Sequence, residues 1–183
     1  MKKLILLSIA FLMLFSCSNM QTDVEKIYGK WESQYSDSEQ SDGIVVKVFE
    51  ESNIEYLRGD KINVEGTLLF EYDWNDEEVQ TLLGSRFKIS YFGYGSLSVD
   101  EEFLITTLEN INPTIDDEYG IEYINSDELD ESEKLRMDIY TELIGSLKNM
   151  QGISDEAEII TLKKDVMVLK SDNDLVTYTK VNN

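Results

Sequence analysis

The sequence predicts a mainly β fold, an antiparallel up-and-down barrel of about eight or nine strands with one helix inserted before the last strands. Three observations support this prediction: apolar and polar residues alternate along many short segments, turn-forming residues separate these segments, and one long segment has helical spacing. Closing the sheet into a barrel removes the exposed edges that a large open sheet would carry. A two-sheet sandwich satisfies the same pattern and is the alternative.

The alternation is clearest in residues 68–75 and 87–91, where large apolar or aromatic side chains occupy every second position. Side chains two residues apart share one face of a strand, so one face of each segment is expected to look inward. The other segments predicted as strands are Trp31–Ser36, Ile44–Glu50, Ile54–Arg58, Phe103–Leu108, Tyr119–Ile124, Glu158–Lys163, Val166–Lys170 and Leu175–Val181. Turns are predicted at Ser41–Gly43, Arg58–Asp60, Gly93–Gly95, Asn110–Pro113 and Asp172–Asp174.

One segment near the C-terminus has the spacing of a helix. Leucine or isoleucine recurs every four residues from Leu135 to Leu147, which places these side chains on one face. Acidic residues crowd the start of the segment and a lysine lies in its last turn, as the helix dipole favours. We therefore expect a helix from about Asp130 to Met150, at the end of an acidic insertion covering about 116–152.

The N-terminus has the pattern of a secretory signal peptide. Lys2 and Lys3 precede an apolar run of about a dozen residues, which is too short to span the roughly 30 Å core of a bilayer. Leu14-Phe15-Ser16-Cys17 resembles the lipobox of bacterial lipoproteins. The resemblance implies that residues 1–16 are removed and that Cys17, the only cysteine, carries a lipid. A plain signal peptide without lipidation is the alternative.

A lipidated Cys17 would divide the remaining chain into two parts. Residues 17–26 are expected to be a polar tether, and residues 27–183 a single domain. Two or three acyl chains hold a protein on a membrane stably while its folded body stays in water. Because Ser18 rather than aspartate follows the cysteine, the resemblance to lipoproteins implies an outer-membrane location in the cell envelope.

The chain is strongly acidic, with a net charge of −21 that becomes −23 when residues 1–16 are removed, because that segment holds two lysines and no acid. Such a charge repels nucleic acid and anionic lipid head groups, and it favours cationic ligands, basic partner proteins or divalent ions. Solubility alone is the simpler explanation of the same composition.

The chain contains no histidine, which removes the usual general base near neutral pH and the commonest transition-metal ligand. Triads and dyads that depend on histidine are therefore excluded, which leaves carboxylate pairs, lysine, tyrosine or Ser-Lys arrangements as the enzymatic routes. We expect no enzymatic activity, no cofactor and no metal site. The acidic segment Asp37–Gly43 does not match a calcium-binding EF-hand loop, because Asp42 stands where that loop needs glycine.

Gly29-Lys30-Trp31, at the start of the first predicted strand, resembles the Gly-x-Trp motif of lipocalins. The C-terminal strand pair, residues 160–169 and 176–181, is similar to the ending of bacterial lipocalin-like lipoproteins. The resemblance implies that Trp31 packs across the closed end of a barrel. Lipocalins place an arginine on this tryptophan, and Lys180 is the residue that could take its place here.

The resemblance also implies a small hydrophobic or amphipathic ligand inside the barrel. The candidate cavity wall consists of Phe70, Tyr72, Trp74, Phe87 and Tyr91. Plain core packing is the alternative for these aromatic side chains. The leading functional hypothesis is thus a membrane-anchored lipoprotein that binds such a ligand. The alternative is an envelope interaction module or inhibitor whose acidic surface binds a basic partner, and the two differ in whether side chains fill the barrel.

Overall fold

The computed structural model describes residues 20–41, 44–100, 102–116, 130–172 and 174–181. The helices are α2 (Met20–Ile27), α3 (Glu77–Leu83) and α4 (Glu131–Asn149). The strands are β1 (Gly29–Ser41), β2 (Ile44–Leu57), β3 (Lys61–Asp73), β4 (Arg86–Asp100), β5 (Phe103–Ile115), β6 (Ser154–Leu162), β7 (Val166–Ser171) and β8 (Asp174–Lys180).

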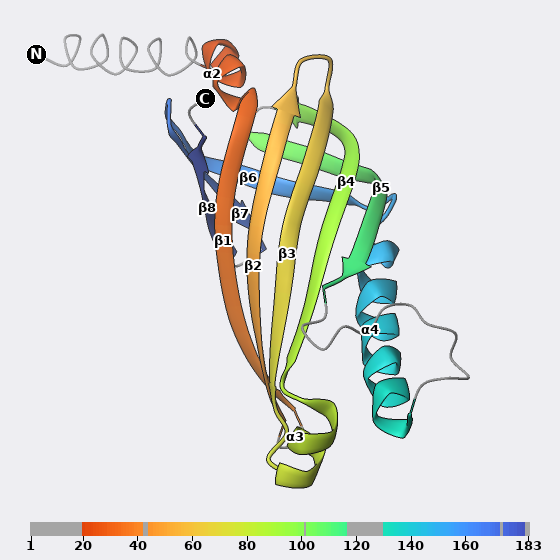
Figure 1. Cartoon of the computed structure of the whole chain (residues 1–183). Coiled ribbons are helices and arrows are strands. Elements are labelled where there is room, and N and C mark those ends of the chain that lie inside the picture. The colour runs from red at the N-terminus through yellow and green to blue at the C-terminus, as the bar shows by residue number, and fades with distance from the viewer. Residues whose placement is uncertain (1–19, 42–43, 101, 117–129, 173, 182–183) are drawn as a thin grey trace, which may run out of the picture.

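Within these residues, eight strands form one closed antiparallel barrel in the order of the sequence, and β8 returns to pair with β1 (Figure 1). The predicted up-and-down barrel is therefore confirmed, and the sandwich alternative is wrong. The insertion of a helix between β5 and β6, before the last strands, is confirmed as well.

The two halves of the barrel differ in length. Strands β1 to β5 contain 13 to 15 residues each, whereas β6, β7 and β8 contain 9, 6 and 7. The long strands therefore extend beyond the short ones, and helix α4 lies beside this extension (Figure 1). Phe87 and Ile89 lie under α4 and share one face of β4 with Leu97, so α4 covers the inner face of the sheet.

A first cluster of buried side chains fills the end of the barrel next to α2. Its members include Trp31, Tyr56 and Met167, each at most 2% exposed. The indole Nε1 of Trp31 donates a hydrogen bond of 2.6 Å to the carbonyl oxygen of Ile27, the last residue of α2. Trp31 thus joins the helix to the barrel wall at this end.

Lys180 of β8 lies over the indole of Trp31. Its Nζ is 4.9 Å from the ring centroid, and it also donates a 2.8 Å hydrogen bond to the carbonyl oxygen of Lys26. Gly29 leaves room for this side chain, because a Cβ there would lie 3.0 Å from Cε of Lys180. The predicted placement of Lys180 on the tryptophan is confirmed, and cation–π attraction adds to the packing.

A second cluster lies at the other end, between α4 and the extended strands. Phe87, Ile89 and Tyr140 are fully buried in it, and the rings of Phe87 and Tyr140 meet edge to face at 5.2 Å. Arg136 of α4 is 5% exposed and donates hydrogen bonds to the carbonyl oxygens of Leu83 and Arg86. Its guanidinium also lies over the Phe87 ring, 4.6 Å from the centroid. These contacts hold α4 against the sheet.

Helix α4 begins where the sequence predicts, because Asp130 and Glu133 form a capping box. The side chain of Asp130 accepts the backbone N–H of Glu133 at 2.9 Å, and the side chain of Glu133 accepts the backbone N–H of Asp130 at 2.8 Å. The hydrogen bond from the Glu133 amide, with another from Ser132, lowers the pKa of the Asp130 carboxyl.

Two of the predicted turns are wrong. Gly93–Gly95 lies inside β4, and Asn110–Pro113 lies inside β5. Glycine is needed within β4 for space rather than for a turn, since a Cβ on Gly93 would lie 2.8 Å from the carbonyl oxygen of Asn110. Pro113 is tolerated because β6 pairs only with residues 103–107 of β5, so no second strand among the described residues needs its missing N–H.

Three further predictions differ from the structure. The segments predicted as separate strands at Ile44–Glu50 and Ile54–Arg58 are one continuous strand, β2. Part of the predicted tether is the helix α2, and the short helix α3 between β3 and β4 was not predicted. The predicted strand Tyr119–Ile124, the signal peptide and Cys17 lie outside the described residues.

Candidate functional site

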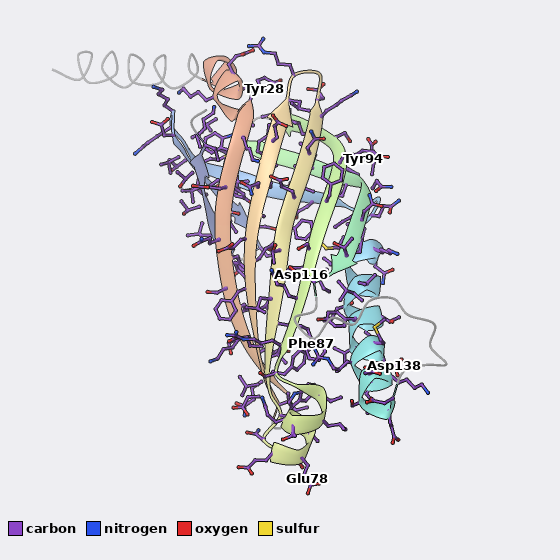
Figure 2. All side chains as sticks on the ribbon, viewed as in Figure 1. Tyr28, Glu78, Phe87, Tyr94, Asp116 and Asp138 are labelled. Carbon is purple, nitrogen blue, oxygen red and sulfur yellow. The ribbon has the colours of Figure 1, made fainter. Side chains whose placement is uncertain are left out.

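The structure brings together four of the five aromatic side chains predicted to line a cavity. Tyr72 stacks on Trp74 with ring centroids 4.6 Å apart, and it meets Phe87 edge to face at 5.4 Å. Phe70 packs in the same cluster, whereas Tyr91 lies apart and contacts the first cluster. Figure 2 places Phe87 near the end of the long strands, on the side where α4 lies.

Helix α4 covers this aromatic group. Ile139, Tyr140 and Leu143 of the helix belong to the same cluster. The indole Nε1 of Trp74 donates a 2.7 Å hydrogen bond to the carbonyl oxygen of Gly84, next to α3. Burial raises the pKa of Tyr72, and the charge of Glu142 raises it further. Phe70, Tyr72, Trp74 and Phe87 thus form an aromatic surface against which α4 packs.

A band of polar side chains separates the two apolar clusters inside the barrel. The Tyr91 hydroxyl donates a hydrogen bond of 2.5 Å to Oε1 of Glu50, and the hydroxyls of Ser33 and Ser52 lie 2.8 Å apart. Tyr178 faces this band from β8. Burial raises its pKa to about 12, with a smaller contribution from the charge of Glu50. Buried polar groups cost free energy unless they are paired, and these hydrogen bonds provide pairing.

Gly66 of β3 makes the position of Tyr91 possible. A Cβ at residue 66 would lie 2.5 Å from the Tyr91 hydroxyl oxygen and 2.7 Å from the backbone oxygen of Glu51. Gly66 and Tyr91 are direct partners in the β3–β4 ladder. The tyrosine ring therefore crosses over the glycine to reach Glu50 on β2.

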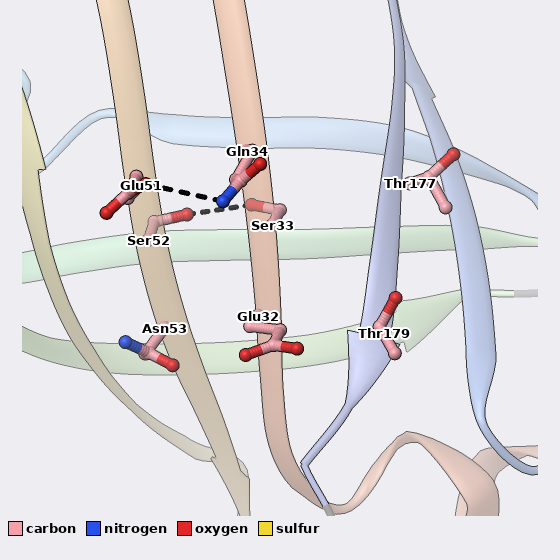
Figure 3. A pocket seen from close by; sticks show the side chains of 8 residues that line it. All are labelled: Glu32, Ser33, Gln34, Glu51, Ser52, Asn53, Thr177 and Thr179. Atoms are coloured by element: carbon pink, nitrogen blue, oxygen red, sulfur yellow. Dashed lines mark hydrogen bonds between the residues drawn. The ribbon is translucent and has the colours of Figure 1, made fainter.

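A polar groove of about 460 Å³ lies on strands β2, β1 and β8 (Figure 3). Two rows of outward side chains border it, each with one residue from β2, β1 and β8. The first row is Asn53, Glu32 and Thr179, and the second is Glu51, Gln34 and Thr177. The rows are two residues apart along each strand, which separates them by about 7 Å. The groove therefore runs across the strands.

The chemistry of the groove suits a cation. Glu32 belongs to the first row and Glu51 to the second, and they occupy diagonal positions of adjacent strands. One bound group can therefore contact both carboxylates. Nε2 of Gln34 donates a hydrogen bond to Oε1 of Glu51 at 3.3 Å. Ser33 and Ser52 lie between the rows, and their side chains turn inward to bond each other. No lysine or arginine is among the residues that line the groove.

Among the described residues, no group of three or more cysteine, aspartate or glutamate side chains could hold a metal ion. No helix in the described part of the chain is long and apolar enough to cross a membrane.

No family model matches the chain, and no curated protein matches it. The strand order is that of a lipocalin-like up-and-down barrel.

The groove was not predicted from the sequence. Its residues come from three strands that are distant in the sequence, and each is an ordinary outward polar residue when taken alone. One signal was present: Glu51, Ser52 and Asn53 form a polar run in the middle of β2, between the two strands predicted there. A polar run with strands on both sides can mark a surface site rather than a break.

Replacing Gly66 by alanine should destabilise the fold, because the new Cβ would collide with Tyr91 and with the backbone of β2. We expect a loss of about 1–3 kcal/mol in the free energy of unfolding, measured by urea denaturation. Gly145→Ala in α4 is the matched control, since nothing lies within 4 Å of its Cβ position; it should gain roughly 0.5–1 kcal/mol. Equal effects of the two substitutions would contradict the packing of Tyr91 over Gly66.

The pKa of Tyr178 predicts a loss of stability at high pH. The folded pKa of about 12 lies above the usual value of 10.0, so the folded state holds the phenol proton more tightly. The stabilising effect of the neutral phenol is complete below the usual pKa and declines as the pH rises through the folded pKa. The urea midpoint should therefore fall over this interval, and it should fall less in Tyr178→Phe, which cannot ionise. Equal falls would contradict the burial of the phenol.

Proposed function

We propose that this protein is a non-enzymatic, lipid-anchored protein of the bacterial cell envelope whose barrel is an interaction module for a cationic partner. The observation that carries the proposal is that side chains occupy both ends of the barrel interior. Trp31, Tyr56 and Met167 fill one end, and Phe87 and Tyr140 fill the other. A partner of this barrel is therefore expected to bind the outer surface.

The charge of the protein supports a cationic partner. The net charge of −23 after removal of residues 1–16 attracts positive charges over a distance and raises the rate of encounter. Glu32 and Glu51 then offer two carboxylates in a groove of neutral polar side chains. Such a surface pairs with lysine or arginine side chains at the rim of a protein interface.

The membrane anchor is part of the proposal and rests on the sequence. Cys17 follows an apolar run and stands only a few residues before α2. A lipid there would hold the α2 end of the barrel near the membrane, which the resemblance to lipoproteins suggests is the outer membrane. The acidic body would then stay in water, away from anionic head groups.

A second candidate function is the carriage of a small hydrophobic or amphipathic ligand. It is favoured by the aromatic group of Phe70, Tyr72, Trp74 and Phe87, which has the composition of a ligand site but is covered by α4. A ligand would have to displace α4 to reach these side chains. Excess mass in native mass spectrometry, lost on denaturation, would favour the carrier over the interaction module.

The role of the groove can be tested with a labelled decalysine peptide and fluorescence anisotropy. The double variant Glu32→Gln/Glu51→Gln should bind the peptide about threefold to tenfold more weakly, because it loses two exposed ion pairs. The matched control is Glu78→Gln/Asp138→Asn, which changes the net charge equally on α3 and α4 (Figure 2). If both variants bind equally weakly, only the overall charge matters and the groove is not the binding site.

The lipid anchor can be tested in bacterial cells supplied with a labelled fatty acid. Cys17→Ser should remove the label and should move the protein from the detergent phase to the aqueous phase on phase separation, because the acylated thiol is gone. Ser18→Ala should keep both properties. Labelling that persists in Cys17→Ser would show that the lipid is attached elsewhere.

A further inference from the structure

The barrel closes over a short distance only. Strands β1 and β8 form three residue pairs, which join Trp31 to Lys180, Glu32 to Thr179, and Ser33 to Tyr178. β1 continues to residue 41 in full register with β2, and β8 begins at Asp174, yet within the described residues the β1–β8 ladder ends at Ser33. Figure 3 shows the two strands separating beyond these pairs, at the groove.

The direction of the main-chain groups in this region follows from one hydrogen bond. The backbone N–H of Val181 donates to the carbonyl oxygen of Lys30 at 2.9 Å, so the main-chain groups of Lys30 point toward β8. Because these groups alternate along a strand, those of Glu32, Gln34 and Ser36 point the same way. Beyond the last pair, Gln34 and Ser36 thus present their N–H and C=O groups at an open edge.

Part of this edge is already protected. The backbone N–H of Ser38 donates to the Asp37 carboxylate at 2.7 Å, which occupies one donor that an added strand could use. Gln34 also lines the groove, opposite Thr177 of β8. The open stretch of β1 therefore begins at the polar groove. Free strand edges recruit other strands by main-chain hydrogen bonds.

The charges around this edge indicate which strand would fit. Glu32 and Glu51 lie on the outer face. Asp37 of β1 and Asp174 of β8 lie close to Tyr35, whose pKa is raised mainly by desolvation and further by the charges of these two carboxylates. A second copy of this chain pairing edge to edge would bring its own acidic side chains against these. Like charges on adjacent strands repel, so a basic strand fits better than a second copy.

We propose that an extended, lysine- or arginine-rich segment of a partner protein adds as a strand to β1 at Gln34–Ser36, beside the groove. This inference rests on the proposed function and names its binding mode. Main-chain hydrogen bonds supply the register, and cationic side chains of the segment meet the carboxylates of the groove.

The test uses the full chain, produced in a bacterial envelope and purified in mild detergent, with the peptide Thr-Lys-Val-Lys-Val-Lys-Thr as probe. Ser36→Pro removes one N–H from the open edge and leaves the β2 ladder intact, because that N–H points away from β2. Its matched control, Ser36→Ala, keeps the N–H. We expect about tenfold weaker peptide binding for the proline variant and little change for alanine, since at least one main-chain hydrogen bond is lost and its partner is left unpaired.

A second probe covers the case in which Ser36→Pro does not fold. The same peptide with N-methyl groups on alternate residues keeps its charge, but its N–H groups along one edge can no longer donate hydrogen bonds. It should bind the unaltered protein as weakly as the unmethylated peptide binds Ser36→Pro. Hydrogen exchange at the amides of Gln34 and Ser36 should slow when the unmethylated peptide binds.

Three results would overturn the inference. Equal affinity for the methylated and unmethylated peptides would mean that side-chain charge alone binds the peptide; the proposed function would then stand while strand addition fails. A dimer that Ser36→Pro dissociates would show that a second copy occupies the edge. No peptide binding at all would contradict both the strand addition and the cationic partner.

Discussion

The unequal length of the strands is the constraint on which the rest of the structure depends. Because β1 to β5 are about twice as long as β7 and β8, the barrel can close over only part of its height. The long strands would otherwise expose their inner apolar face to water. Helix α4 covers that face where β6 to β8 are too short to do so, and the same mismatch leaves the edge of β1 open.

The interior is therefore divided into layers with different chemistry. Apolar side chains fill both ends, while Glu50, Tyr91, Tyr178 and the serine pair Ser33 and Ser52 form the layer between them. A half-buried carboxylate bonded to a tyrosine hydroxyl contributes less to stability than apolar packing, since both groups lose water. The layer does fix the register of four strands, because each group must meet its partner.

The sequence was informative wherever one residue pattern decides the structure. Alternation with period two predicted the strands, and the spacing from Leu135 to Leu147, with acids at its start, placed α4 within one residue at each end. Prediction failed where glycine or proline serves a tertiary contact. Gly93 and Gly95 make room for a neighbouring strand, so their similarity to a turn sequence was misleading. The short helix α3 depends on the Asp76 cap and on α4, which its few residues do not reveal.

The candidate site was predictable only in part, for a related reason. Four of the aromatic side chains lie together, since they alternate on adjacent strands and share one face. The packing of α4 over these side chains could not be predicted, because it depends on hydrogen bonds from Arg136 to the carbonyl oxygens of Leu83 and Arg86. The groove required knowing that β8 lies beside β1, a pairing that spans almost the whole chain.

That pairing also has a kinetic consequence. The residues that close the barrel, such as Trp31 and Lys180, are about 150 positions apart, so their contact requires one of the largest loop closures available to this chain. Contacts between distant residues slow folding, and this one cannot form until β8 has been synthesised. The β1–β4 sheet is built from adjacent hairpins and needs only local loop closures, whereas closure at Trp31 requires both β1 and β8. Without that closure the inner faces of the sheet lack part of their cover and are open to aggregation.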